Sequence, residues 1–167
     1  MATPTKNVQG TYKTGGIPIR QPGASSFGRT YFVDATDGND DNAGDRPDHA
    51  VATIGKGVDR AGENGYDATV IVRRGFYQPE DTIALTTDHL GIKILNDQLM
   101  PVHAGSDTKI YNIGGPDDIF TIDSADNVEI AGFRMWPEML KTATGINIGS
   151  TAGCVGTWIH DNAIINV

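Results

Sequence analysis

Three stretches of the sequence share one pattern: Gly91-Ile92-Lys93-Ile94-Leu95-Asn96-Asp97, Asn127-Val128-Glu129-Ile130-Ala131-Gly132-Phe133 and Thr157-Trp158-Ile159-His160-Asp161-Asn162. Alignment on the central isoleucines of the three stretches gives offsets of 36 and 29 residues. Each stretch is a short run of strand-forming residues followed by turn-forming Asn, Asp or Gly. Repeats of about 20–50 residues, each a single small unit of structure, are typical of solenoid proteins. The larger offset leaves room for one irregular turn of the solenoid.

The rest of the chain from residue 68 onward repeats this pattern. Short apolar runs, many of them alternating with period two, recur between turn-forming residues. The predicted strands are Thr69–Val72, Ile83–Leu85, Ile92–Leu95, Ile110–Ile113, Ile119–Ile122, Val128–Ile130, Phe133–Trp136, Ile146–Ile148, Trp158–Ile159 and Ile164–Val167. One short strand per face, turned by Asn, Asp or Gly, makes the solenoid a parallel β-helix of about four coils.

Composition agrees with an all-β fold of one domain. The chain has 167 residues, in which Ile and Val number 27 whereas Leu and Met number only 9. Only one stretch predicts a helix: Ile54, Val58 and Ala61 lie on one helical face, behind Thr53 as the N-cap. Gly55 and Gly57 weaken this helix, which is expected to end near Gly62–Gly65.

Charge is distributed unevenly along the chain. The net charge is −8, yet residues 1–30 contain four basic residues and no acid, which leaves −12 on the remainder. With three prolines and few large apolar groups, this segment cannot form a core, so we interpret residues 1–30 as an extended docking arm. Its Ile17-Pro18-Ile19 motif suits strand addition to the sheet edge of a partner. The alternative is a disordered tail.

Several classes of protein are excluded by simple counts. No stretch reaches the roughly 20 apolar residues of a membrane span, and the first ten residues lack the apolar core of a signal peptide. The acidic net charge argues against duplex nucleic acid as the main partner. Cys154 is the only cysteine, so an intramolecular disulfide is impossible and a small buried apolar role is expected.

The order of motifs after residue 30 resembles a known family. Tyr31-Phe32-Val33-Asp34, the Asp37–Gly44 loop, Ala52-Thr53-Ile54, Ala68–Val72 and Gly75-Phe76-Tyr77 are similar to the opening of right-handed parallel β-helix proteins. That pectate-lyase-like superfamily includes phage tailspikes and β-helical virion proteins. The resemblance implies an N-terminal cap with a short helix over residues 31–67, and right-handed β-helical coils over residues 68–167.

Oxygen-bearing residues raise two chemical hypotheses, neither of which the spacing favours. Asp37, Asn39, Asp41 and Asp48 occupy positions 1, 3, 5 and 12 of a calcium-type loop, but position 6 is Asn42 rather than glycine. The alternative is a tight turn that uses these side chains for backbone hydrogen bonds. We therefore expect neither a metal nor a cofactor.

Paired carboxylates of the kind that glycosidases use also occur. They are Asp117/Asp118, Asp123/Asp126/Glu129 and Glu80/Asp81. In a chain with 17 aspartates such pairs arise in turns by default, so we expect no catalytic residue. A lyase would need basic groups, for which the candidates Arg73, Arg74, Arg134, His103 and His160 form no recognisable set. His160 is expected to cap a turn beside Asp161 and Asn162.

Two features predict association between subunits. The chain stops at Ile164-Ile165-Asn166-Val167, inside a predicted strand and without a polar cap. Either it is a fragment of a longer β-helix or other chains close the open end, and we expect the second. In addition, at least one of Phe133, Met135 and Trp136 must point outward, which suits an interface. The alternative is that Trp136 only covers the edge of a coil.

The resemblance, the arm, the missing cap and the short length together predict a structural protein of a tailed bacteriophage virion. We expect a homotrimeric head decoration (cement) protein on the capsid surface, with the major capsid protein as partner and with neither nucleic acid nor membrane bound. The arm residues expected to dock are Lys6, Lys13, Ile17, Pro18, Ile19 and Arg20. One alternative is the attachment part of a tail fibre or tailspike, bound to a tail component. Another is a polysaccharide-cleaving enzyme fragment of the pectate-lyase-like group.

Overall fold

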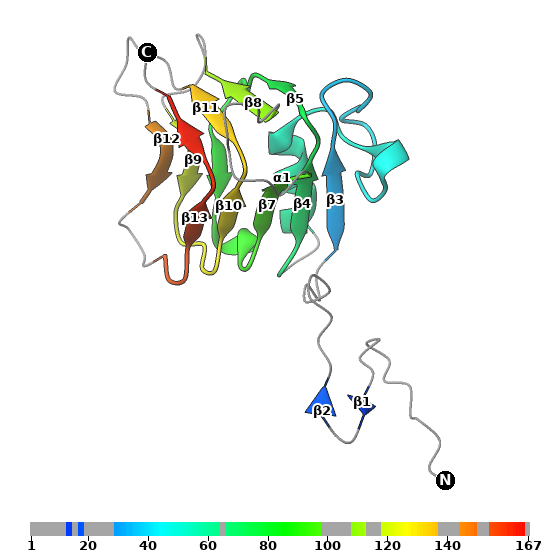
Figure 1. Ribbon diagram of the computed structural model, residues 1–167, viewed down its shortest axis with the longest axis vertical. Helices are drawn as coiled ribbons and strands as arrows, with labels where there is room; N and C mark the ends of the chain where they lie inside the picture. Colours follow the sequence, from blue (N-terminus) through cyan, green and yellow to red (C-terminus); the bar gives the residue numbers. More distant parts are fainter. Residues whose placement is uncertain are drawn as a thin grey trace.

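The computed structural model describes residues 29–63, 66–97, 108–112, 118–136, 144–149 and 154–165, together with the backbone of residues 13–14 and 17–18. Within these ranges the chain is mostly β, with the single α-helix α1 (Ile54–Glu63) and the short 3-10 helices η1 (Pro47–His49) and η2 (Thr87–His89) (Figure 1). The all-β class predicted from composition and periodicity is confirmed.

The strands from β3 onward form three parallel sheets, and β1 (Lys13–Thr14) pairs antiparallel with β2 (Ile17–Pro18). The first sheet contains β3 (Thr30–Val33), β4 (Thr69–Val72), β7 (Lys93–Asn96), β10 (Glu129–Ala131) and β13 (Trp158–His160), side by side in this order. The second contains β5 (Gly75–Tyr77), β8 (Thr108–Tyr111), β11 (Arg134–Trp136) and β14 (Ala163–Ile164). The third contains β6 (Ile83–Leu85), β9 (Asp118–Ile122) and β12 (Thr144–Ile148). From β4 onward, every third strand therefore returns to the same sheet.

The register of the first sheet matches the repeat found in the sequence. Ile130 pairs with Ile94 on one side and with Ile159 on the other, and Ile94 also pairs with Val70. The offsets of 36 and 29 residues are thus the numbers of residues that separate equivalent positions on adjacent strands. The repeat predicted both the pairing partners and their alignment.

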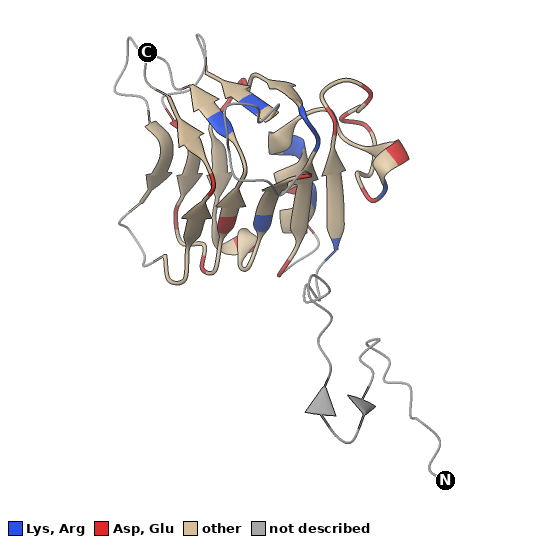
Figure 2. Cartoon of the chain, in the orientation of Figure 1, with Lys and Arg blue, Asp and Glu red and all other residues tan. Residues whose placement is uncertain are grey.

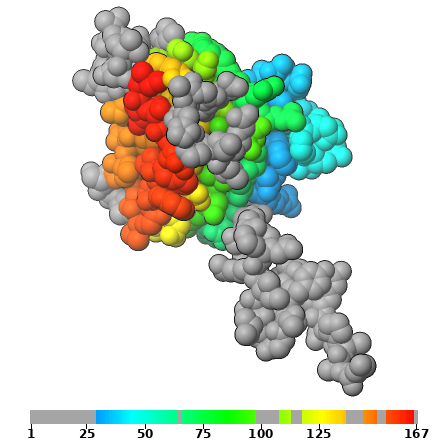
Figure 3. Space-filling model, in the orientation of Figure 1, coloured from blue at the N-terminus to red at the C-terminus, as the bar shows by residue number. Residues whose placement is uncertain are grey.

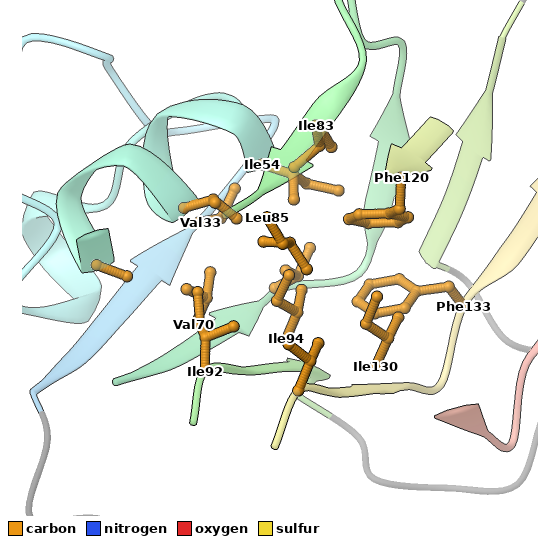
Figure 4. Packing of buried hydrophobic residues seen from close by; sticks show 14 of the residues in the cluster. Val33, Ile54, Val70, Ile83, Leu85, Ile92, Ile94, Phe120, Ile130 and Phe133 are labelled. Carbon is orange, nitrogen blue, oxygen red and sulfur yellow. The ribbon is translucent and has the colours of Figure 1, made fainter. Parts of the chain in front are cut away.

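The core is built from the inward-facing positions of all three sheets (Figure 4). Val70, Ile94 and Ile130 of the first sheet are fully buried. From the third sheet Phe120 reaches the ring of Phe133, with 6.4 Å between the ring centroids. Since side chains alternate between the two faces of a strand, the remaining positions point out of the body. Those outward positions are the ones available for function.

Helix α1 packs on β3 and β4, at the N-terminal end of the stack of strands. It begins where the sequence predicts. The Thr53 Oγ1 atom accepts a hydrogen bond from the Lys56 N–H at 3.2 Å, as an N-cap does. Gly57 costs the helix up to about 1 kcal/mol in propensity. A Cβ atom at this position would lie 2.6 Å from Cγ2 of Val33. The glycine therefore allows the helix to approach the sheet closely.

Turn asparagines connect neighbouring strands of the stack. The Asn96 side chain is buried and donates a hydrogen bond to the Gly132 carbonyl at 3.0 Å. Asn162 donates to the Ile130 carbonyl at 2.8 Å and accepts from the Phe133 N–H at 2.9 Å. Gly132 has a φ of +90°, which disfavours other residues. The turn asparagines identified in the sequence therefore form hydrogen bonds with backbone groups near the neighbouring strand.

Replacement of Ile130 by Ala is expected to lower the free energy of unfolding by about 2–5 kcal/mol, because a cavity opens between Ile94 and Ile159. Urea unfolding measures this loss. The matched control is Thr121→Ala, at a partly buried outward position of β9, for which a change within about 0.5 kcal/mol is expected. Equal losses for both variants would contradict the inward assignment of Ile130.

Candidate functional site

The outer face of the second sheet carries a stack of three aromatic rings. Tyr77, Ile110 and Met135 are aligned across β5, β8 and β11 and are buried. Their neighbours along the strands therefore point outward. Phe76 stacks on Tyr111 with ring centroids 4.6 Å apart and an angle of 26° between the planes. Tyr111 stacks on Trp136 at 4.4 Å and 12°.

Two cations lie beside these rings. Lys109 and Arg134 are register partners on β8 and β11, at outward positions of the same face. The Arg134 guanidinium lies over the indole of Trp136, with 5.2 Å from Cζ to the ring centroid, within the range of a cation–π interaction. In Figure 2 the strands that Figure 1 labels β8 and β11 carry blue segments, the colour of Lys and Arg. Each of the three strands carries one aromatic residue at an outward position, but the sequence alone does not show how the strands pair.

The expected subunit interface at Phe133, Met135 and Trp136 needs correction. Phe133 and Met135 are fully buried within the chain and belong to its core. Only Trp136 lies at the surface, partly buried against Tyr111. Met135 faces inward because it continues the inward row of Tyr77 and Ile110, and Phe133 precedes the strand at a turn that points to the core. Neither of the two buried residues is available to another subunit.

Most of the predicted arm lies outside the described residues, including Lys6, Ile19 and Arg20. The backbone of β1 (Lys13–Thr14) pairs antiparallel with β2 (Ile17–Pro18). Ile17 and Pro18 thus belong to a strand pairing within the chain. Addition of this segment to the sheet edge of a partner stays a prediction.

Asp118, a member of one predicted carboxylate pair, connects two strands of the third sheet. Its Oδ1 accepts hydrogen bonds from the Thr144 N–H and hydroxyl, and its Oδ2 accepts from Asn147 Nδ2 at 2.8 Å. Burial raises the pKa of Asp118, but these hydrogen bonds lower it by more, so its pKa lies below the ordinary value. The carboxylate binds β12 to β9, whereas the partner in the predicted pair, Asp117, lies outside the described residues.

Other carboxylates of the predicted pairs also accept hydrogen bonds from groups of the same chain. Asp126 accepts a hydrogen bond from the Val155 N–H at 2.8 Å, and Asp123 accepts one from the Ser124 hydroxyl at 3.3 Å. Glu80 and Asp81 differ, since they are exposed and line an open groove between β5, β6 and the start of α1.

Among the basic candidates, Arg73 forms an ion pair at 2.7 Å with the buried carboxylate of Asp34. Burial raises the pKa of Asp34, but hydrogen bonds from Arg73 and from two backbone N–H groups lower it below its ordinary value. Arg74 is exposed directly before β5. Arg134 lies in the aromatic face, and His103 is outside the described residues. Each of these three arginines therefore has a different environment.

In the loop over residues 37–48, side-chain oxygens act as turn-forming acceptors. Asn39 Oδ1 accepts from the Asp41 N–H at 3.0 Å, and Asp48 forms a surface ion pair with Arg46. Asp40 Oδ1 accepts from the backbone N–H groups of Ala52 and Thr53, ahead of α1. In the part of the chain that the structure describes, no group of three or more His, Cys, Asp or Glu is placed to hold a metal ion. These contacts favour the turn interpretation over the calcium loop.

A cluster of ionisable groups lies on the outer face of the first sheet. Glu129 forms ion pairs with Lys93 at 3.2 Å and with His160 Nε2 at 3.1 Å. His160 Nδ1 also lies 2.8 Å from Asp161 Oδ2, and the imidazole packs on the exposed ring of Trp158. Burial lowers the pKa of His160, but the two carboxylates raise it by more, so its pKa lies above the ordinary value. His160 thus contacts the side chain of its neighbour Asp161, and its contact with Glu129 joins two strands; its role as a turn cap stays a prediction.

Substitution of His160 by Gln is expected to lower the Tm more at about pH 5.5 than at about pH 8.5. Because the pKa of His160 is raised in the folded state, its stabilising effect is complete below the ordinary value of 6.5 and disappears as the pH rises through the folded value. Thermal unfolding at both pH values checks this, with His49→Gln in η1 as the control for loss of a surface imidazole. An equal loss of Tm at both pH values for His160→Gln would contradict the ion pairs.

The outer face of the first sheet also carries an apolar row. Phe32, Ile71, Leu95 and Ala131 are aligned across β3, β4, β7 and β10, and their strand neighbours fill the core. Phe32, Ile71 and Leu95 are partly buried. The outer face of this sheet therefore carries an apolar row beside the ionisable cluster, and parallel sheets with apolar residues on both faces are typically covered on both sides.

The last strands expose further apolar side chains. Trp158 is 61% exposed and Val155 68%, and Ile148 and Ile164 are each about half exposed. Cys154 is partly buried against the core, close to the expected role. In Figure 3 these strands, orange to red, lie at the side of the body opposite the loop over residues 37–48. Four of the exposed large apolar side chains therefore lie at this end of the stack.

Comparison with known protein families, curated proteins and solved structures found no match. Among the described residues, no helix is both long enough and apolar enough to cross a membrane. The functional conclusion therefore depends on the surfaces described above.

Proposed function

We propose that the body of this chain is a short right-handed parallel β-helix, with residues 31–67 as its N-terminal cap. Support comes from the three parallel sheets, from the return of every third strand to the same sheet, and from in-register isoleucines on adjacent strands. Parallel strands joined by crossovers within one sheet are right-handed in about 98% of cases.

We further propose that the protein is a structural component of a tailed bacteriophage virion, namely a homotrimeric head decoration protein. The observation that carries the proposal is the apolar row of Phe32, Ile71, Leu95 and Ala131 on the outside of the first sheet. An apolar row across four strands of a parallel sheet needs a covering surface. The resemblance to β-helical virion proteins, which are usually trimers with their helices side by side, makes two further copies the natural cover.

In such a trimer the first sheets of three copies face the three-fold axis. Their apolar rows meet there, and the Lys93–Glu129–His160 cluster lies beside the row. The basic segment of residues 1–30 then binds the acidic surface of the capsid. Without this segment, that surface would repel the net negative charge of the remaining residues. The interface thus moves from Phe133 and Met135 to the first sheet.

Replacement of Leu95 by Lys is expected to convert the trimer to monomers, because three ammonium groups would be brought together without partners at the axis. Sedimentation velocity at micromolar concentration measures the mass. The matched control is Thr121→Lys on the outer face of the third sheet, which should remain trimeric. A wild-type protein that sediments as a monomer would refute the trimer, whereas a Leu95→Lys trimer would place its interface elsewhere.

Quantitative mass spectrometry of purified particles from the source of the protein tests the position in the virion. Hundreds of copies relative to the major capsid protein are expected for a head decoration protein. A dozen or two would indicate the tail fibre or tailspike alternative, and no copies would exclude the virion role. In that case the polysaccharide-cleaving alternative predicts depolymerisation of an acidic glycan and loss of that activity on substitution of Glu80 or Asp81.

Removal of residues 1–28, which end before β3, is expected to abolish binding to capsids that lack the protein while the trimer remains. Co-sedimentation with such capsids measures binding. Retention of full binding by the shortened protein would contradict the role of Lys6, Lys13, Arg20 and their neighbours.

A further inference from the structure

The groove between α1, β5 and β6 carries two carboxylates that are open to a partner. Its volume is about 680 Å³, which is large enough for a short peptide segment. Glu80 and Asp81 line the groove, and both are exposed. Within the described ranges, neither side chain forms an ion pair or a hydrogen bond. Both carboxylates are therefore available to a cationic group.

Negative charge predominates in this groove. Among the described residues that line it, Lys56 is the one Lys or Arg, against the four acids Asp40, Asp59, Glu80 and Asp81. After residue 28, Lys141 is the only Lys or Arg that lies outside the described ranges. Even together, Lys56 and Lys141 would not balance the four acids. The charge of the groove thus favours a cationic partner.

Apolar surface lies beside these carboxylates. Phe76 lines the groove and is 54% exposed. One face of its ring stacks on Tyr111, and β5 is the edge strand of the second sheet, so no described strand lies beside the other ring face. A Cβ atom at Gly55, in the first turn of α1, would meet no atom within 4 Å. Gly55 therefore weakens the helix without allowing a closer contact, and it leaves the groove open above the helix.

We propose that this groove binds residues 17–20 of a second copy of the chain. These residues combine two isoleucines and a proline with Arg20. The Arg20 guanidinium forms ion pairs with Glu80 and Asp81, and the apolar part of the segment lies on the open ring face of Phe76. Proline-containing segments that bind in grooves with aromatic walls lose little conformational entropy.

The charge and the length of the N-terminal segment fit this role. Residues 1–28 contain Lys6, Lys13 and Arg20 and no acid. The strands β1 and β2 form a sheet of their own, so they are not part of the three sheets of the body. Arg29 joins the first sheet through a hydrogen bond from the Thr69 N–H, and the connection from Arg20 to Arg29 can span up to about 30 Å. That length reaches an adjacent subunit.

The inference rests on the proposed homotrimer, because the trimer supplies the second copy. In that trimer the first sheets face the three-fold axis, whereas the groove is lined by residues of α1, β5 and β6 and stays open. Each subunit would then bind the next through residues 17–20, and Lys6 would remain for the capsid.

The test is carbodiimide cross-linking, which joins amines to adjacent carboxylates, on the full-length protein at low ionic strength. Unlabelled and nitrogen-15-labelled chains are refolded together, so that mass spectrometry distinguishes links between copies. Lys13 is the register partner of Pro18 and accompanies it into the groove. Links from Lys13 of one copy to Glu80 or Asp81 of another are expected at a yield at least about fivefold above links to Asp45, an exposed residue before η1.

Arg20→Gln is expected to lower the yield of these links between copies at least about fivefold, because the segment loses its ion pairs in the groove. The matched control is Arg29→Gln, which removes a cation just before β3 and should leave the yield within about twofold. Sedimentation velocity records the mass of each protein before the reaction.

A trimer in which Lys13 joins Asp45 as often as Glu80 and Asp81 would show that the groove has no preference, and the proposal would be wrong. It would also be wrong if the links to the groove stayed within one copy, if the trimer formed none, or if Arg20→Gln left the yield unchanged. A monomeric wild-type protein would overturn the trimer and with it the second copy. A trimer without links in the groove overturns only this inference.

Discussion

The in-register pairing of isoleucines along the first sheet is the constraint on which the rest of the structure depends. Ile94, Ile130 and Ile159 lie on adjacent strands, and each buries its side chain against the next. A shift of one residue would turn all of them out of the core, so the register is strongly determined. Once it is set, the inward positions of the other two sheets follow, and so do the outward positions.

The outward positions of each sheet carry a different kind of side chain, so the outer faces of the three sheets differ in chemistry. The first sheet places an apolar row beside the ion pairs of Glu129, and the second stacks aromatic rings beside two cations. The third is polar, with Asp118 bound to Thr144 and Asn147.

Several acidic side chains, two of them members of the predicted carboxylate pairs, connect distant parts of the fold. Asp34, Asp118 and Asp126 each accept hydrogen bonds from residues at least 26 positions further along the chain, or bind a cation there. Hydrogen bonds keep the pKa values of Asp34 and Asp118 below the ordinary value despite burial. In a stack of short strands, such side chains join successive turns of the chain, since each strand alone forms few backbone hydrogen bonds.

The sequence by itself determined the place of most described strands, the N-cap at Thr53, the turn residues and the alignment of the three isoleucines, because these depend on local propensity and on period two. It did not predict β5 (Gly75–Tyr77), which is too short to show alternation. It could not determine that Met135 and Phe133 face the core while Trp136 faces out, since a one-residue change of register exchanges the two faces. Nor could it show that Phe76, Tyr111 and Trp136 form one stack. Those residues are separated by 35 and 25 positions, and only the lateral pairing of β5, β8 and β11 brings them together.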